Sequence, residues 1–141
     1  MKLSITRTDV WATSIDDRPG GLANTLAPLA EAGANLEFIV ARRAPEQSGK
    51  GVVFITPVKG AKQVKAAGVA GFQKTGTLHS VRIEGGDKPG MGAKITKALA
   101  DSGINLRGLS AAAFGRKFVT YLALDSAEAA TKAIAILKKL S

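Results

Sequence analysis

The chain has 141 residues, of which 45% are hydrophobic and 22% are charged, a balance typical of a globular protein. It contains no cysteine, which excludes disulfide bonds and thiol catalysis and favours a reducing compartment. Residues 1–7 contain no long apolar run, so we expect no signal peptide, no membrane partner and a cytoplasmic protein. The net charge is +9, and residues 59–141 carry the whole excess, with fourteen basic against five acidic side chains. The excess either attracts a polyanion or keeps a small protein soluble, and we favour the second interpretation.

The predicted elements of residues 2–84 alternate short strands with two helices. Leu22, Leu26 and Leu29 recur at helical spacing, and Gly33 is expected to end that helix in a left-handed conformation. Pro28 removes one hydrogen bond inside it, so we expect a kink. In chain order the predicted elements are strands at 2–7 and 10–15, a helix at 21–32, strands at 35–42 and 51–58, a helix at 61–70, and strands at 72–77 and 78–84.

The rest of the chain repeats this order. Met91, Ile95 and Leu99 share one face of a predicted helix. Asp125, with Glu128 three residues later, resembles the capping box that begins a helix. The predicted elements are a helix at 91–102, strands at 105–112 and 117–124, and a final helix from 125 to 140.

A seven-residue motif occurs twice and explains the repeated order. Residues 17–23 read Asp-Arg-Pro-Gly-Gly-Leu-Ala, and residues 87–93 read Asp-Lys-Pro-Gly-Met-Gly-Ala. Identities continue at the same offset: Leu29, Ala30, Gly33, Asn35 and Leu36 recur as Leu99, Ala100, Gly103, Asn105 and Leu106. An offset held without a gap over this length indicates an internal duplication. We therefore expect two units, 1–74 and 75–141.

Each unit reads strand-helix-strand-strand-helix and needs one more strand to form a split βαβ sandwich, an α+β fold. In the first unit, 72–77 supplies that strand. The second unit ends on a helix, whereas 2–7 has no assigned partner. The simplest arrangement lets 2–7 cross over and complete the second sheet.

Catalytic chemistry is not expected. The single histidine, His79, cannot form a metal site or a catalytic triad alone, and acidic residues in turns such as Asp16, Asp17 and Asp87 usually cap helices or face solvent. The glycine-rich turns lack the Gly-Lys-Thr ending of a P-loop and the third glycine of a dinucleotide fingerprint. We expect no enzyme activity, no metal and no cofactor.

The turns do offer backbone groups. Gly20, Gly21, Gly90 and Gly92 have no Cβ, so a ligand can approach the chain closely. The first amides of a helix have no hydrogen-bond partner within it, and a carboxylate is a suitable ligand for them. Equally, the glycines can serve only to permit the turn.

These residues resemble the ACT domain, a small regulatory module of amino-acid metabolism. The resemblance is carried by a strand, the Asp-x-Pro-Gly turn, and a helix that ends in Gly-x-Asn-Leu, in both units. It implies two ferredoxin-like βαββαβ units with sheets side by side and an amino acid bound where modules meet. It also implies homodimers and a regulated enzyme partner. The implied ligand-binding residues are Asp17, Pro19, Gly20, Gly21, Leu22, Asn35 and Leu36, with Asp87, Pro89, Gly90, Met91, Gly92, Asn105 and Leu106.

Nucleic-acid binding is the alternative, because RNA-recognition motifs share the split βαβ fold and this chain is basic. Residues 114–121 match the third-strand signature of that family at Gly115, Phe118, Val119 and Tyr121. However, Arg116 stands where a stacking aromatic is needed, and only 5% of the chain is aromatic. Val119 and Tyr121 are equally explained as core residues.

Overall fold

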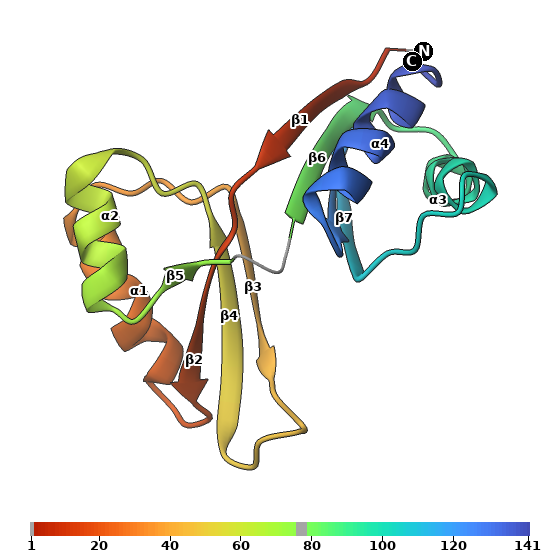
Figure 1. Cartoon of the computed structure of the whole chain (residues 1–141). Helices are drawn as coiled ribbons and strands as arrows, with labels where there is room; N and C mark the ends of the chain where they lie inside the picture. Colours follow the sequence, from red (N-terminus) through yellow and green to blue (C-terminus); the bar gives the residue numbers. More distant parts are fainter. Residues whose placement is uncertain (1, 76–78) are drawn as a thin grey trace. The chain divides into compact units, whose positions relative to one another are not determined.

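The computed structural model describes residues 2–75 and 79–141 of the chain (Figure 1). The chain divides into two compact units. The first unit is Asp9–Thr75, and the second unit combines Met1–Thr8 with Gly76–Ser141. Each unit has a four-stranded antiparallel sheet with two helices on one face (Figure 1).

The first unit has the element order of a βαββαβ fold. Its elements are β2 (Trp11–Asp16), α1 (Gly21–Glu31), β3 (Phe38–Arg43), β4 (Lys50–Thr56), α2 (Gly60–Val69) and β5 (Gln73–Lys74). The strands lie in the order β3-β4-β2-β5. Each helix therefore connects two strands that are not neighbours, as in ferredoxin-like folds.

The second unit has the same architecture but takes one strand from the start of the chain. Its elements are β1 (Ser4–Thr8), β6 (His79–Gly86), α3 (Met91–Asp101), β7 (Gly108–Phe114), β8 (Lys117–Leu124) and α4 (Ala127–Lys138). The strands lie in the order β1-β6-β8-β7, and β1 pairs antiparallel with β6 from Ser4–Glu84 to Thr8–Ser80. Both units are thus ferredoxin-like, and β1 fills the fourth-strand position of the second.

The cores form because alternate residues of each central strand face the helices. In the first unit, Val53 and Ile55 of β4 are fully buried against Leu29 of α1. In the second unit, Leu122 and Leu124 of β8 are buried in the same way. The remaining fully buried large side chains are Val81, Ile83, Ile95, Leu99 and Leu137, all in the second unit.

Helices α1 and α3 end in the same motif. Gly33 and Gly103 have φ values of 82° and 78°, which confirms the left-handed ends expected from the sequence. The Ala34 N–H donates to the Leu29 carbonyl at 3.0 Å, the longer bond of a Schellman motif. Helix α1 continues through Pro28 to Glu31.

Three boundary predictions were wrong. After each Schellman motif the chain stays irregular longer than predicted, so β3 begins at Phe38 and β7 at Gly108 rather than at 35 and 105. The N-cap of α4 is Ser126, whose hydroxyl accepts from the Ala129 N–H, and not Asp125. The strands predicted at 72–77 and 78–84 correspond to β5 and β6, which lie in different sheets. Residues 76–78 of that prediction lie outside the described residues.

No helix in the described part of the chain combines the length and apolar character needed to cross a membrane.

Candidate functional site

The repeated motif forms the same turn in both units. Gly20 has φ 87° and ψ −12°, and Gly90 has φ 83° and ψ 4°. In the first turn the Gly21 N–H donates to the Arg18 carbonyl at 3.1 Å. Proline followed by a glycine of positive φ defines a type II turn, in which a residue with a Cβ is strained. The glycine of each motif is therefore required by the turn itself.

The first turn also has a close backbone approach that the second lacks. A Cβ built on Gly21 would collide with the carbonyl oxygen of Asp16. In the second unit the equivalent residue is Met91, whose side chain is buried in the core. The next position changes in the opposite sense, from Leu22 to the exposed Gly92. The two turns have the same backbone conformation but different side chains at the positions that follow it.

The start of α1 has two amides without a partner in the described chain. The Gly21 N–H is used within the turn, and the Asn24 N–H donates to the Gly20 carbonyl at 2.9 Å. The amides of Leu22 and Ala23 make no hydrogen bond to any described residue. They lie at the positive end of the helix dipole, where an anionic group is stabilised.

A pocket of about 220 Å³ lies beside this turn, within the first unit. Three segments form it: the end of β2 with its turn into α1, the end of β3, and the start of β4. Gly51 of β4 pairs with both Ile15 and Arg43, and the Ile15 side chain and the Arg42 carbonyl oxygen lie where a Cβ on Gly51 would project. The lining residues are Ile15, Asp16, Asp17, Arg18, Leu22, Ala41, Arg42, Arg43 and Gly51.

Ion pairs connect the three segments. Asp17 accepts a hydrogen bond from Nε of Arg43 at 2.8 Å, and Asp16 accepts one from the Lys50 ammonium at 2.7 Å. The Lys50 hydrogen bond lowers the pKa of Asp16, so this carboxylate is ionised at neutral pH. Asp17 is one of the implied ligand-binding residues, and the structure shows it paired with Arg43. A ligand ammonium would have to displace that pair.

The structure separates the implied binding residues of the first unit into two groups. Asp17 and Leu22 line the pocket, and Pro19, Gly20 and Gly21 form the adjacent turn. Asn35 and Leu36 lie beyond the other end of α1, an eleven-residue helix about 16 Å long. Within one unit, these two groups do not form a single site. The same separation holds for Asp87, Pro89, Gly90, Met91 and Gly92 against Asn105 and Leu106.

In the second unit, Phe118 stands at the position equivalent to Gly51, and Gly85 stands at the position equivalent to Ile15. Register places Phe118 opposite Gly85 and Ala113, as Gly51 lies opposite Ile15 and Arg43. The Phe118 ring lies where a Cβ on Gly85 would meet it, at 3.0 Å, and is 6% exposed. Ala112 and Ala113 stand where the first unit has Arg42 and Arg43. The two turns therefore border different environments.

Seven of the lining residues were not among the implied ligand-binding residues: Ile15, Asp16, Arg18, Ala41, Arg42, Arg43 and Gly51. Two signals could have identified Arg42, Arg43 and Gly51. The adjacent arginines come just before a hairpin. In the predicted fold, the strand that they end runs parallel to the strand before the turn, so both strands end on the same side of the sheet. The exchange of Gly51 for Phe118 between the repeats is also visible in the sequence.

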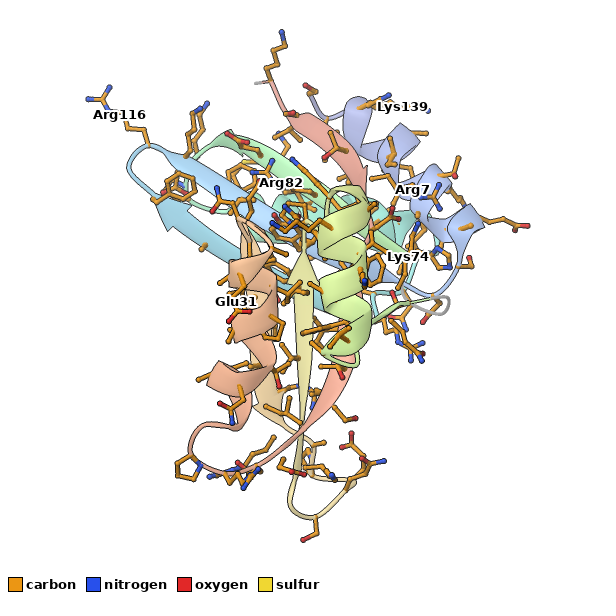
Figure 2. The ribbon with its side chains drawn as sticks, turned by 90° about the vertical axis from the view of Figure 1, so that its left-hand side faces the viewer. Arg7, Glu31, Lys74, Arg82, Arg116 and Lys139 are labelled. Atoms are coloured by element: carbon orange, nitrogen blue, oxygen red, sulfur yellow. The ribbon has the colours of Figure 1, made fainter. Side chains whose placement is uncertain are left out.

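The residues that suggested RNA binding do not form a stacking surface. Phe118 belongs to the core of the second unit, and Tyr121, 6% exposed, accepts a hydrogen bond from Nε of Arg82 at 3.1 Å. Arg116 lies at the tip of the β7–β8 hairpin and projects away from the sheet (Figure 2). Phe118 and Tyr121 are thus not available to bases in this conformation. Across the residues described, no group of three or more potential metal-ligating side chains comes together.

Comparison with known proteins finds one family model that matches part of the chain. Residues 13–67, which lie within the first unit, match the family model of the ACT domain. The match covers most of the first unit. The second unit has the same turn, element order and sheet order, so the chain consists of two units of one fold, the first of which matches the ACT domain. No curated protein matches the chain.

Solved structures share the fold over nearly the whole chain. A protein from Bacteroides thetaiotaomicron is 18% identical with a TM-score of 0.79, over 96% of this chain and 90% of that one. The ligand-free regulatory subunit of aspartate kinase from Thermus thermophilus is 18% identical with a TM-score of 0.65, over 97% and 95%. Aspartokinase III from E. coli, in complex with aspartate and ADP, is 14% identical with a TM-score of 0.57, over 98% of this chain and 32% of its own. These similarities establish a common fold.

Proposed function

We propose that this protein is a non-catalytic regulatory protein that binds a free amino acid in the pocket beside the β2–α1 turn. The ACT domain match supports a regulatory role in binding a small ligand. The observation that carries the site is the pocket itself, which brings Asp17, Ile15 and Leu22 together beside the start of α1. Its volume of about 220 Å³ suits a molecule of amino-acid size.

Each group of an amino acid has a matching group in this site. The α-carboxylate accepts hydrogen bonds from the amides of Leu22 and Ala23. The ammonium group pairs with Asp17 in place of Arg43, an exchange that is easy because the Arg43 side chain is 82% exposed. Ile15 and Leu22 contact the apolar part of the ligand. Regulation requires reversible binding, so we expect a Kd between about 1 μM and 1 mM.

We further propose that two copies of the chain associate through sheet edges. The edge strands β3 and β7 carry exposed apolar side chains: Ile39 is 46%, Leu109 44% and Phe114 59% exposed. Exposed apolar edge strands favour pairing with another chain. In this proposal, Asn35 and Leu36 contribute to a ligand site only when they come from the second copy of the chain. A regulated enzyme is the remaining partner, as the similarity to a kinase regulatory subunit suggests.

The experiment is isothermal titration calorimetry with all twenty amino acids, on the wild-type protein and two matched variants. Ala41→Trp adds a bulky side chain to the pocket wall, and Ala111→Trp makes the same change at the equivalent exposed position of β7. We expect at least one amino acid to bind, and Ala41→Trp to weaken that binding by about 100-fold or more. Ala111→Trp should leave it unchanged. Absence of binding by every amino acid, or equal affinity in both variants, would contradict the proposal.

A further inference from the structure

The basic side chains of the protein are concentrated in the second unit. This unit holds twelve Lys and Arg against five Asp and Glu, a net charge of +7, whereas the first unit holds eight against six. A charge spread over a whole surface serves solubility, whereas a charge gathered at one place attracts an anionic partner. The location of the excess within the second unit therefore decides between these two roles.

Four segments of the second unit meet at one end of its sheet. The Leu3 N–H, just before β1, donates to Oγ of Ser141, beyond the end of α4, at 2.7 Å. A Cβ built on Gly85, near the end of β6, would meet the Leu3 side chain. The Asp87 N–H donates to the Arg116 carbonyl at 2.8 Å, which joins the β6–α3 turn to the β7–β8 hairpin. The start of β1, the end of α4, this turn and this hairpin thus lie together.

Seven exposed basic side chains, which we call the basic end, belong to these segments and to the first turn of α3. They are Lys2, Lys88, Lys94, Arg116, Lys117, Lys138 and Lys139. Figure 2 shows Arg116 and Lys139 at the upper edge of the view. Lys117 pairs with Glu84 at 3.4 Å, and no carboxylate of the described chain forms an ion pair with the other six. Since Glu84 and Asp87 are the acidic residues of these segments, the net charge here is +5.

The composition of the basic end favours phosphate groups over a protein surface. Six of the seven cations are lysines, which are depleted from protein–protein interfaces. Of the exposed large apolar side chains in the described chain, Phe114 alone belongs to these segments. Single-stranded nucleic acids are bound by stacking their bases on aromatic rings, and Phe118 and Tyr121 are buried. Dense positive charge without a stacking surface is typical of proteins that bind the backbone of a duplex.

The β7–β8 hairpin distinguishes a DNA duplex from an RNA duplex. Arg116 stands at its tip and projects away from the sheet (Figure 2). The major groove of B-DNA admits a two-stranded β-ribbon, whereas that of A-form RNA is too narrow for side chains to read. We infer that the basic end binds the phosphate backbone of double-stranded DNA, with the hairpin tip directed at the major groove. This function is separate from the amino-acid pocket, which belongs to the first unit.

The test is fluorescence anisotropy of a labelled DNA duplex of about 20 base pairs, titrated with the full chain between about 50 and 200 mM KCl. Neutralised phosphates release condensed counterions, so we expect log K to fall with the logarithm of salt concentration, with a slope between about −4 and −6. The triple variant Lys88→Gln, Arg116→Gln and Lys139→Gln removes one cation from each of three segments. It should make the slope shallower by about 3 and weaken binding at every salt concentration.

A matched control makes the same charge change at exposed positions of the first unit, through Lys59→Gln, Lys62→Gln and Lys65→Gln together. This control should keep the wild-type slope. Equal slopes in the two triple variants would mean that net charge carries the binding, and would overturn the inference. An unchanged anisotropy at the lowest salt concentration would also overturn it. Tighter binding of an RNA duplex of the same sequence, or of an oligoglutamate peptide, would assign the surface to RNA or to an acidic protein instead.

Discussion

Single residues define the shape of the β2–α1 and β6–α3 turns. Gly20 and Gly90 have φ values near 85°, a region that costs an L-residue with a Cβ about 1–2 kcal/mol. Neither would meet another atom closer than 3.9 Å with an added Cβ, so conformational strain is the main cost. Substitution of these two glycines therefore measures backbone strain without an added packing clash.

We predict that Gly20→Ala and Gly90→Ala each lower the free energy of unfolding by about 1–2 kcal/mol. Asparagine tolerates the left-handed region better, so Gly20→Asn should cost clearly less. Urea denaturation at constant temperature measures all three. Alanine variants as stable as the wild type would show that the turn relaxes and does not require glycine.

The protonation of one residue, Glu84, also affects the stability of the protein. Hydrogen bonds from Arg82 and then Lys117 lower the pKa of Glu84 below its ordinary value in an unfolded chain. The ion pairs therefore contribute stability above about pH 4.3, and that stability is lost as pH falls through the lower folded-state pKa.

We predict that the wild type loses stability between pH 5 and pH 3 more steeply than Glu84→Gln does. The glutamine cannot titrate, so its contribution stays constant across that range. The measurement is the urea midpoint at each pH for both proteins. Parallel pH profiles would mean that Glu84 has the same pKa in the folded and unfolded states.

At the scale of elements, β1 is separated from the strand that it pairs with, β6, by the whole first unit of the chain. Leu3, just before it, is 7% exposed in the core of the second unit, and its N–H donates to Oγ of Ser141 at 2.7 Å. Arg7 donates to Oγ1 of Thr131 at 3.2 Å and to the Ala127 carbonyl at 3.1 Å. The strand is attached both to β6 and to α4.

We predict that Leu3→Ala lowers the free energy of unfolding by about 2–5 kcal/mol, because it leaves a cavity in the core. The control is Thr6→Ala on the exposed face of β1, with an expected change within about 0.5 kcal/mol. Equal effects of the two substitutions would contradict the role of β1 in closing the second core.

The sequence predicted more of the fold than of the site. Counting strands was enough to assign 2–7 to the second sheet, because each unit needs four and only one strand was spare. Strand starts after Gly33 and Gly103 were placed three residues early, since identity between repeats identifies related residues and not their backbone state. The Asp17–Arg43 and Asp16–Lys50 pairs join residues 26 and 34 positions apart, so sequence spacing alone gave no sign of them.

At the scale of the whole molecule, duplication has produced two units with one fold and different chemistry. Around the pocket, the first unit has Ile15, Gly51, Leu22, Arg42 and Arg43. At the equivalent positions the second unit has Gly85, Phe118, Gly92, Ala112 and Ala113, and its core is larger. We therefore propose that ligand binding belongs to the first copy.

The most direct test of this asymmetry is a two-dimensional ¹H–¹⁵N NMR titration of the wild-type chain with the strongest binder from calorimetry. We predict shift changes at the amides of Leu22, Arg42 and Gly51. The equivalent amides of Gly92, Ala112 and Phe118 should not move. Shift changes confined to the second set, or no changes at saturating ligand, would contradict it.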